Sequence, residues 1–554
     1  MIICGLKITH DSTIALLRDN KLIFSIELEK INNNNRYKIL PDLSAVSEIL
    51  GKYGFKISDI DEFVLDGWID NGGGIPAASN GKDVVVRAAP YHENGKHANP
   101  LTPFYFNNLI LNGSTVKYTS YMHVTGHIFS AYCTSPFSKV GEDAFILVWD
   151  GGMYPRLYHY SCRERKLTFI DNLFFIGVNA YSIFCQHFGP FKINENIIKD
   201  ELSIAGKIMA FTALGKVRQE IVHEIKLAYE ETITCASSIS SIPQYPYKLA
   251  KQFVRRVVNS NFYDEDVIAS FHYFLEELLV NSLYRVIRRT GYRTQNLCLV
   301  GGAALNIKWN GKIRDSGIVR NVWTCPFPND SGSAIGAACT SMINNLDYQS
   351  LEWSVYSGPA IIENVADEGW TSQQFSLKEL AQLLHKTNEP VVFLNDRAEL
   401  GPRALGNRSI LASPSFLKTK HILNDIKYRE SYRPVAPVCL EEFAAEIFSP
   451  GNPDPYMLYD HRVNPVWENR LRAIVHEDGT ARLQTVSEKT NKELYSLLAE
   501  FYLLSGIPVL CNTSANFKGC GFFPDIFSAT RWGKVNYVWC NGKLYTKISK
   551  VSFI

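Results

Sequence analysis

The feature that most constrains the fold of this chain is a unit of strand, polar turn, strand, turn and strand that occurs twice. The first unit opens with apolar residues 2–8 and the turn Thr9-His10-Asp11-Ser12. The second opens with apolar residues 144–149 and the turn Asp150-Gly151-Gly152. Two such β-meander openings predict two related α/β halves. The strands expected to complete the two units are 13–17, 22–28, 157–161 and 167–170.

Further signals extend this pattern and divide the chain. Residues 297–300 are an apolar strand that enters a Gly-rich turn, and a helix follows. The irregular stretch 347–364 separates a predicted first domain, residues 1–346, from a second, residues 365–554. Residues 70–108, rich in Gly, Pro, Asn and His, predict an elaborated loop. Helices are expected at 219–229, 264–290, 331–345 and 377–387, and a strand at 390–394.

The composition is that of a folded protein, since 46% of the 554 residues are hydrophobic and 20% are charged. The 57 basic and 55 acidic side chains nearly cancel, which argues against a general polyanion binder. The apolar stretches are too short to cross a bilayer, and the first residues lack the basic segment of a signal peptide. The 12 cysteines contain no C-x-x-C pair and indicate free thiols in a reducing compartment. We therefore expect a cytoplasmic protein that makes no membrane contact.

A mixed set of nitrogen and oxygen donors indicates a metal site. His123 and His127 are spaced to share one face of a helix, as two ligands of one metal would. Asp150 follows an apolar strand, and Asp330 precedes a helix, so both carboxylates can reach the same place. This set suits iron, manganese or zinc. The alternative is a pair of ordinary histidines on an amphipathic helix.

Glycine turns predict phosphate binding in the first half of the chain. Gly151-Gly152 and Gly301-Gly302 expose backbone N–H groups, and the helix after Asp330 has an N-terminus that attracts anions. Singly these are only turns; together they describe an actin-like fold that holds a nucleotide between two α/β halves. His10, at the end of the first strand, is either a capped turn residue or a general base.

A cluster of cations in the second half predicts an anion clamp. Residues 399–411 and 423–437 bring several Arg and Lys residues together among Gly, Pro and apolar residues, unlike an ordinary charged surface. Planar guanidinium groups bind phosphate or carboxylate through two hydrogen bonds, so several of them suit a ligand set with more than one phosphate group. The residues of this set are Arg403, Arg408, Lys427, Arg429 and Arg433, and it is extended by Arg482 and by Asn512-Thr513-Ser514-Ala515-Asn516.

With these motifs the chain resembles the O-carbamoyltransferases of nodulation-factor, cephamycin and tobramycin biosynthesis, over nearly its whole length and most specifically in residues 401–437. The resemblance implies an actin-like (ASKHA), two-lobed N-terminal domain and a YrdC-like α/β C-terminal domain. The second domain would form carbamoyl-AMP from carbamoyl phosphate and ATP with Mg²⁺ and release pyrophosphate. The first would transfer the carbamoyl group to a hydroxyl.

The resemblance also assigns roles to residues. His10 matches the proton acceptor, and the metal ligands, which usually hold Fe²⁺, match His123, His127, Asp150 and Asp330. The residues that match the carbamoyl phosphate and ATP site are Arg403, Lys427, Arg433, Arg482, Asn512 and Ser514. Those expected around the adenylate in the first domain are Gly151, Gly206, Lys207, Gly301, Gly302 and Asn306. Apart from the resemblance, Arg36, Tyr91 and His92 are expected on the acceptor side, which residues 70–108 would face, and the rings of Tyr91 and His92 could stack on a base or a sugar.

The chain departs from the family pattern in two motifs and in segment 70–108. Basic residues and a His that normally follow the third strand are replaced by Asn32-Asn33-Asn34-Asn35. The usual Asn-x-x-Gly-Glu-Pro is Asn516-Phe517-Lys518-Gly519-Cys520-Gly521. Residues 70–108 match nothing in the family.

Other acceptors and functions remain open at this point. The acceptor can be a sugar or another natural product, or a hydroxymethylpyrimidine, free or in DNA. Basic residues on two predicted helices could face DNA or simply be solvated: Lys248, Lys251, Arg255, Arg256, Arg285, Arg288, Arg289 and Arg293. The alternative enzyme is a threonylcarbamoyl-type transferase acting on tRNA, and the alternative outside enzymes is a nucleotide-gated binding protein.

Overall fold

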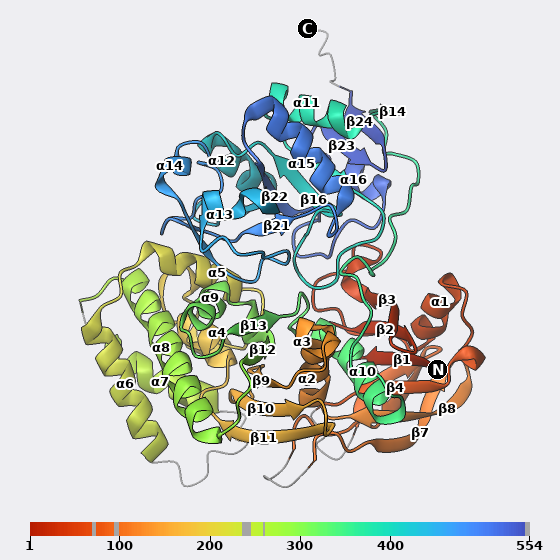
Figure 1. Ribbon diagram of the computed structural model, residues 1–554, viewed down its shortest axis with the longest axis vertical. Helices are drawn as coiled ribbons and strands as arrows, with labels where there is room; N and C mark the ends of the chain where they lie inside the picture. Colours follow the sequence, from red (N-terminus) through yellow and green to blue (C-terminus); the bar gives the residue numbers. More distant parts are fainter. Residues whose placement is uncertain (69–73, 94–98, 235–244, 259–260, 549–554) are drawn as a thin grey trace.

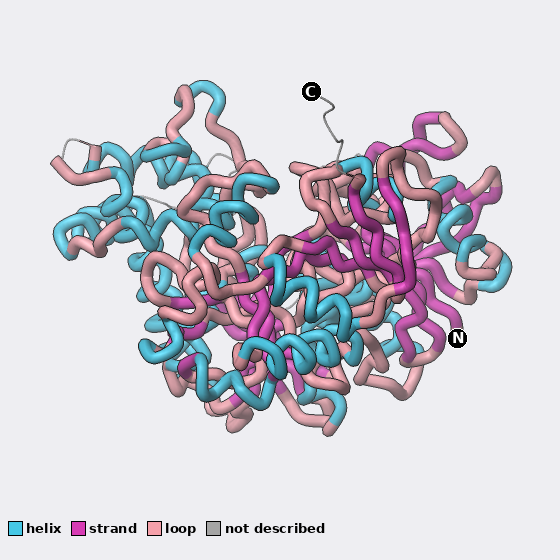
Figure 2. The backbone as a smooth tube through the Cα atoms, turned by 90° about the horizontal axis from the view of Figure 1, so that it is seen from above, coloured by secondary structure: helices cyan, strands magenta, loops and turns pink. Residues whose placement is uncertain are grey.

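The computed structural model describes residues 1–554 apart from 69–73, 94–98, 235–244, 259–260 and 549–554. Three large sheets organise these residues (Figure 1). Two of them lie in the N-terminal part of the chain and the third in the C-terminal part, which stacks on the first two. Seen from above, helices gather on one side of the molecule and strands on the side of the N-terminus (Figure 2).

The first sheet has six strands in the order β3-β2-β1-β4-β8-β7. β1 pairs antiparallel with β2 and parallel with β4, and β4 pairs parallel with β8. The polar turn after β1 therefore lies at the carboxyl end of this parallel set, where ligands bind in open α/β sheets. The strands are β1 Ile2–Lys7, β2 Thr13–Arg18, β3 Lys21–Glu27, β4 Glu62–Asp66, β7 Phe104–Leu111 and β8 Ser114–Tyr121.

The second sheet repeats this arrangement in the order β11-β10-β9-β12-β13. Its first three strands form an antiparallel meander, and β12 and β13 add in parallel beside β9. The prediction of two related α/β halves is thereby confirmed, and so is the mixed α/β class. The strands are β9 Ala144–Val148, β10 Arg156–Ser161, β11 Lys166–Asn172, β12 Asn296–Val300 and β13 Asn321–Thr324.

Helices α2 (His123–Thr134) and α10 (Ser333–Asn345) pack against each other between the two sheets (Figure 1). Their crossing needs glycine at position 336, because a Cβ on Gly336 would stand 1.7 Å from the carbonyl oxygen of Gly126. This close approach brings the first turn of α2 next to the residues that precede α10. A helical layer covers the outer face of the second sheet: α4 Asn179–Cys185, α5 Ala205–Phe211, α6 Gln219–Thr234, α7 Tyr245–Val257, α8 Asp264–Thr290 and α9 Ile307–Asp315.

The third sheet has eight strands in the order β14-β24-β23-β15-β16-β22-β17-β21. Its apolar core is separate from those of the first two sheets. The helices expected at 264–290 and 377–387 form with those bounds, as α8 and α11 (Leu377–Thr387). The strands are β14 Trp370–Gln374, β15 Val391–Leu394, β16 Arg408–Ala412, β17 Ala436–Leu440, β21 Gln484–Val486, β22 Val509–Ser514, β23 Tyr537–Cys540 and β24 Lys543–Lys547, and the other helices here include α12 Leu417–Ile426, α15 Lys492–Ser505 and α16 Ile526–Trp532.

The expectation of a loop over residues 70–108 is wrong in part. Within it β5 (Ile75–Ser79) and β6 (Lys82–Val86) form an antiparallel hairpin, and β7 begins at Phe104. The hairpin contributes the buried residues Ile75 and Val86 to the core of the first sheet. Within this stretch, 70–73 and 94–98 lie outside the described residues. Among the described residues, no helix combines the length and apolar character needed to cross a membrane.

Candidate active site

Four buried side chains converge at the crossing of α2 and α10. One ligand atom from each of His123, His127, Asp150 and Asp330 lies within 4.8 Å of the others. The two imidazole Nε2 atoms are 3.1 Å apart. Asp330 Oδ1 is 3.4 Å from both of them, and Asp150 Oδ2 is 3.7 Å from His123 Nε2. Two nitrogens and two carboxylate oxygens in this space fit a first-row divalent cation.

Helix α2, the turn after β9 and the short turn before α10 contribute to this cluster. His123 and His127 face it from the first turns of α2, as their spacing predicts. Asp150 follows β9, the first strand of the second sheet, and Asp330 opens the short turn that leads into α10. The convergence therefore depends on how the two halves pack, and it forms at the carboxyl ends of their central strands.

The Asp150 carboxylate is fixed from both sides. The Gly302 N–H donates to its Oδ1 at 2.7 Å, and the Tyr91 hydroxyl donates to its Oδ2 at 2.7 Å. Gly301 adopts φ +93°, and a Cβ there would stand 2.4 Å from the carbonyl oxygen of Trp149, so this turn requires glycine. Gly151 (φ +48°) also lies beside the Tyr91 hydroxyl.

The cluster is electrostatically coupled. Burial and Asp330 act to raise the pKa of Asp150, but His127 and His123 outweigh them and hold it below its ordinary value. Burial lowers the pKa of His123, whereas Asp66 and Asp330 hold it well above its ordinary value. A bound cation would take the place of the protons that these imidazoles otherwise hold.

Sequence reasoning missed two charged residues behind the cluster. Asp66, at the end of β4, accepts from His123 Nδ1 at 2.7 Å. Lys7, at the end of β1, places its Nζ 3.0 Å from Asp66 Oδ2 and 2.9 Å from Asp330 Oδ2. Both side chains are almost fully buried. Lys7 ends β1 and Asp66 ends β4, and these two strands pair in parallel. A charged residue at the end of an apolar strand was the sequence signal that could have marked each of them as a site residue.

His10 stands at the more open edge of the cluster. Its Nδ1 lies 3.1 Å from Asp11 Oδ2, and its Nε2 lies 3.4 Å from Asp330 Oδ2. With 35% of its side chain exposed, it is far more accessible than the buried imidazoles of His123 and His127. In a neutral His10 imidazole the contact with Asp11 favours the proton on Nδ1, and Nε2 then faces Asp330 as the acceptor nitrogen.

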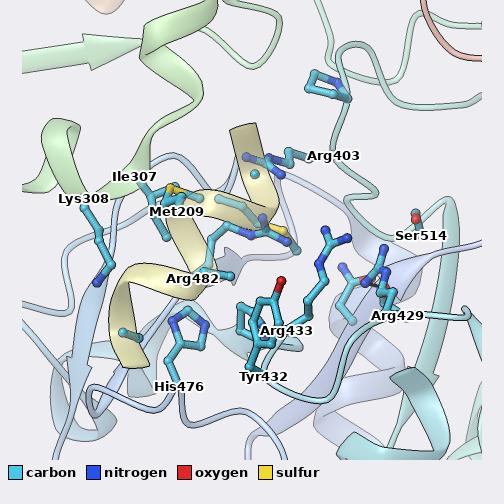
Figure 3. Close-up of a pocket in the computed structure, with 18 of the residues that line it drawn as sticks. Met209, Ile307, Lys308, Arg403, Arg429, Tyr432, Arg433, His476, Arg482 and Ser514 are labelled. Atoms are coloured by element: carbon cyan, nitrogen blue, oxygen red, sulfur yellow. Dashed lines mark hydrogen bonds between the residues drawn. The ribbon is translucent and has the colours of Figure 1, made fainter. Parts of the chain in front are cut away.

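A second site is a cavity between the N-terminal and C-terminal parts of the chain (Figure 3). Five arginines line it: Arg36, Arg403, Arg429, Arg433 and Arg482. In Figure 3, Arg429, Arg433 and Ser514 lie on one side, and Met209, Ile307, Lys308 and His476 lie on the other. Among its lining residues Glu477 and Asp478 are the acidic ones. The cavity is therefore suited to a polyanion.

The arginines depress each other's pKa. Burial, Arg36 and Arg433 lower the pKa of Arg403 to about 10, and burial, Arg433 and Arg482 lower that of Arg429 to about 9. Arg403 donates to the Leu305 carbonyl oxygen at 3.3 Å, and Arg429 donates to Thr513 Oγ1 at 2.9 Å. An anion placed here would relieve the repulsion among these cations.

Two other predicted anion-binding residues, Lys427 and Arg408, direct their charged groups to backbone carbonyl oxygens. Asn512 and Ser514 line the cavity, but the Lys427 ammonium donates to the carbonyl oxygens of Ser514 and Asn516, both at 2.9 Å. Lys427 is absent from the described lining, and its contacts fix the strand end that carries Asn512 and Ser514. Arg408 likewise donates to carbonyl oxygens, among them that of Asn395 at 2.7 Å.

The residues expected around the adenylate are divided between the two sites. Gly301 and Gly302 lie at the His/Asp cluster, whereas Gly206, on α5, lines the arginine cavity. Lys207, next to Gly206 in the chain, forms an ion pair of 2.9 Å with Glu430. Asn306 caps α9, accepting from the backbone N–H groups of Lys308 and Trp309.

The residues expected on the acceptor side are also separated. Tyr91 lies in the His/Asp cluster, with its ring centroid 4.5 Å from that of His123, and His92 follows it. Arg36 lines the arginine cavity and donates to the Pro402 carbonyl oxygen at 3.4 Å. The assignment of these residues to an acceptor stays a prediction.

The two motif departures lie against each other. The Arg36 N–H donates to the Gly519 carbonyl oxygen at 2.9 Å, and the Gly521 N–H donates to that of Asn34 at 3.0 Å. A Cβ on Gly521 would stand 1.9 Å from the carbonyl oxygen of Glu29. The asparagine run and the altered loop therefore form one contact between the two parts of the chain.

The basic helix residues form a mixed surface. On α7, Arg256 pairs with Glu224 at 3.0 Å and also contacts Glu231. On α8, Arg285, Arg288 and Arg289 are exposed, with Arg288 over the Tyr284 ring. Nucleic acid as a partner stays a prediction.

Comparison with known proteins identifies the family. The Carbamoyltransferase N-terminus family model matches residues 2–339, and the Carbamoyltransferase C-terminus model matches residues 381–542. Nodulation protein U of Rhizobium tropici is 46% identical, with 99% of this chain and 96% of that protein covered. The 3'-hydroxymethylcephem-O-carbamoyltransferase of Amycolatopsis lactamdurans is 31% identical, with 94% of each covered. The buried His/Asp cluster and the arginine-lined cavity thus belong to an enzyme, and the chain is a member of the carbamoyltransferase family.

Proposed function

We propose that this enzyme is an ATP-dependent O-carbamoyltransferase that works in two half-reactions. The first forms carbamoyl-AMP in the arginine-lined cavity. The second transfers the carbamoyl group to an acceptor hydroxyl at the His/Asp cluster. The observation that supports this proposal most strongly is the cavity lined by five arginines from both parts of the chain, with only two acidic residues in its described lining. The repeated topology of the first two sheets supports an actin-like N-terminal domain, residues 1–346. We place a YrdC-like adenylate-forming domain at residues 365–554.

In the first half-reaction, water cleaves carbamoyl phosphate into carbamate and phosphate. A carbamate oxygen then attacks the α-phosphorus of ATP, and the bond to the β-phosphate breaks to release pyrophosphate. Arg403, Arg429 and Arg433 would bind the negative phosphate oxygens, which carry the charge in this transfer. Mg²⁺ would accompany the ATP. The side of the cavity with the apolar residues Met209 and Ile307 would take the nucleoside.

In the second half-reaction, an acceptor oxygen attacks the carbamoyl carbon and AMP leaves. His10 Nε2 would take the hydroxyl proton, while Asp11 holds the imidazole in the required tautomer. His123, His127, Asp150 and Asp330 would hold a divalent metal, for which Fe²⁺ is our expectation. When bound, that ion would act as a Lewis acid for the carbonyl oxygen of the carbamoyl group.

We infer that the acceptor is a hydroxyl group of a sugar or another natural product. The name of the cephem relative specifies a hydroxymethyl group on the acceptor, which supports a hydroxyl here. His10, at the more open edge of the cluster, is the group that such a hydroxyl would approach.

The decisive experiment measures pyrophosphate release on mixing the protein with ATP and carbamoyl phosphate, without an acceptor. We expect release that requires both substrates and is abolished by Arg403→Ala. Arg472→Ala, which removes an exposed arginine from the same part of the chain, is the matched control and should be unaffected. Release that persists in Arg403→Ala, or no release by the wild-type protein, would refute adenylate formation in this cavity.

A further inference from the structure

Lys7 is a buried ammonium directly behind the His/Asp cluster. It is 2% exposed and stands 3.9 Å from the centre of the Trp68 ring. Its Nζ bridges Asp330, one of the four cluster residues, and Asp66, which lies outside the four. A buried ammonium ion is costly unless it is paired, so its position requires both carboxylates.

Asp66 in turn orients His123. A carboxylate accepts, so the 2.7 Å contact places the proton of His123 on Nδ1 and leaves the Nε2 lone pair directed at the cluster. The other oxygen, Asp66 Oδ1, has no hydrogen-bond partner among the residues that the structure describes. The charge of Asp66 is thus balanced by Lys7 and by the His123 N–H.

The charges around the cluster suit a particular ion. Asp66, Asp150 and Asp330 supply three negative charges, and Lys7 supplies one positive charge, with neutral imidazoles completing the set. Two negative charges remain for a cation to neutralise. At the cluster's open edge His10 lies 3.4 Å from Asp330 Oδ2 and 3.1 Å from Asp11 Oδ2, and this pair adds no net charge when the His10 imidazole is protonated. In a buried site of low dielectric constant, the net charge of the surrounding residues strongly affects the affinity for ions of different charge.

We propose that Lys7 and Asp66 form a charge-setting pair that makes the cluster a site for a divalent rather than a trivalent cation. This inference rests on the metal site of the proposed function and adds residues that do not ligate the ion. Lys7 acts through charge and Asp66 through both charge and the orientation of His123. Removal of either should therefore change which ion binds, in opposite directions.

The test measures the affinity of metal-free protein for Mn²⁺ and Ga³⁺ by competition with a chelator. Lys7→Met leaves three negative charges and should shift the Mn²⁺/Ga³⁺ affinity ratio about tenfold or more toward Ga³⁺. Asp66→Asn, whose amide oxygen can still accept from His123, leaves one negative charge and should shift the ratio the other way. The double variant restores two negative charges and should return the ratio to the wild-type value.

The matched control is Lys30→Met, which removes another buried, paired ammonium away from the cluster. It should lower stability without changing the ratio. If the ratio stays the same in Lys7→Met and Asp66→Asn, or if the double variant fails to restore it, the pair does not set the charge. If Lys7→Met does not fold, Asp66→Asn and the double variant still decide the outcome. If the wild-type protein binds neither ion, the metal site itself is refuted.

Discussion

Lys30, just after the last strand of the first meander, places its ammonium 2.7 Å from the carbonyl oxygen of Gly401, in the loop that carries Arg403. The same ammonium contacts the Glu399 carbonyl oxygen at 2.5 Å and Glu27 Oε1 at 2.7 Å. The Gly401 N–H also donates to Glu27 Oε1 at 2.7 Å. One buried ion pair of the N-terminal part thus holds the anion-binding loop of the C-terminal part.

Lys30→Met should destabilise the protein by about 3–5 kcal/mol, because Glu27 would be left as an unpaired buried charge. Chemical denaturation measures this change in the free energy of unfolding. Pyrophosphate release should also fall, since Arg403 loses its support. Lys21→Met, at the exposed start of β3, is the control and should leave both quantities unchanged. Equal stability of the two variants would contradict the role of Lys30.

Polyanions should stabilise the protein against heat. The arginine cavity concentrates like charges, and binding of pyrophosphate or ATP to the folded state alone would add about 2.7 kcal/mol at a hundredfold excess over Kd. Differential scanning fluorimetry measures the shift in Tm. Arg433→Ala should reduce the shift, whereas Arg472→Ala should preserve it. A shift of the same size in both variants would place the anion elsewhere.

His10→Ala should separate the two half-reactions. Pyrophosphate release should continue, while carbamoyl transfer to a hydroxyl acceptor should fall by about 10²–10⁴-fold, the usual contribution of a general base. Chromatographic assay of the carbamoylated product measures the transfer. His223→Ala, on the exposed face of α6, is the matched control. Normal transfer by His10→Ala would show that another group takes the proton.

Stability should fall as the pH is lowered from about 6.5, in part because of His272. Burial, with a smaller effect from Lys308, lowers the pKa of His272 to about 3. The unfolded chain takes up this proton near its ordinary pKa of about 6.5, while the folded chain does not. This contribution is therefore complete above pH 6.5 and is lost toward pH 3, at about 1.4 kcal/mol per pH unit. Denaturation at pH 7 and pH 5 measures it, and His272→Gln should reduce the difference. An unchanged difference would contradict this origin.

Gly521→Ala should weaken the contact between the asparagine run and the altered loop. Its Cβ would collide with the carbonyl oxygen of Glu29, so the backbone must move, at a cost of about 1–3 kcal/mol. Thermal unfolding measures the loss. Gly51→Ala, in helix α1 (Ser44–Lys52) with open space around the new Cβ, should cause no loss. Similar values for the two variants would show that the loop adjusts freely.

The sequence by itself determined the elements whose signal is local. Strands β1 and β9, the polar turns after them and helices α8 and α11 follow from apolar periodicity and turn residues, which act between near neighbours in the chain. The pairing of His123 with His127 follows from helix geometry in the same way. The carbamoyltransferase family also follows from the sequence, through the motif in residues 401–437.

Only the tertiary structure decided which distant residues share a site. Lys7 and Asp66 reach the His/Asp cluster because β1 and β4 pair in parallel, and no local pattern marks that pairing. Arg36 joins the arginine cavity across more than 360 residues of chain, as its contact with Pro402 shows. The positive charge of Lys427 made it a candidate anion ligand. In the fold, its ammonium donates to backbone carbonyl oxygens instead. The direction of a long cationic side chain is set by what packs around it, and that is fixed by contacts far apart in sequence.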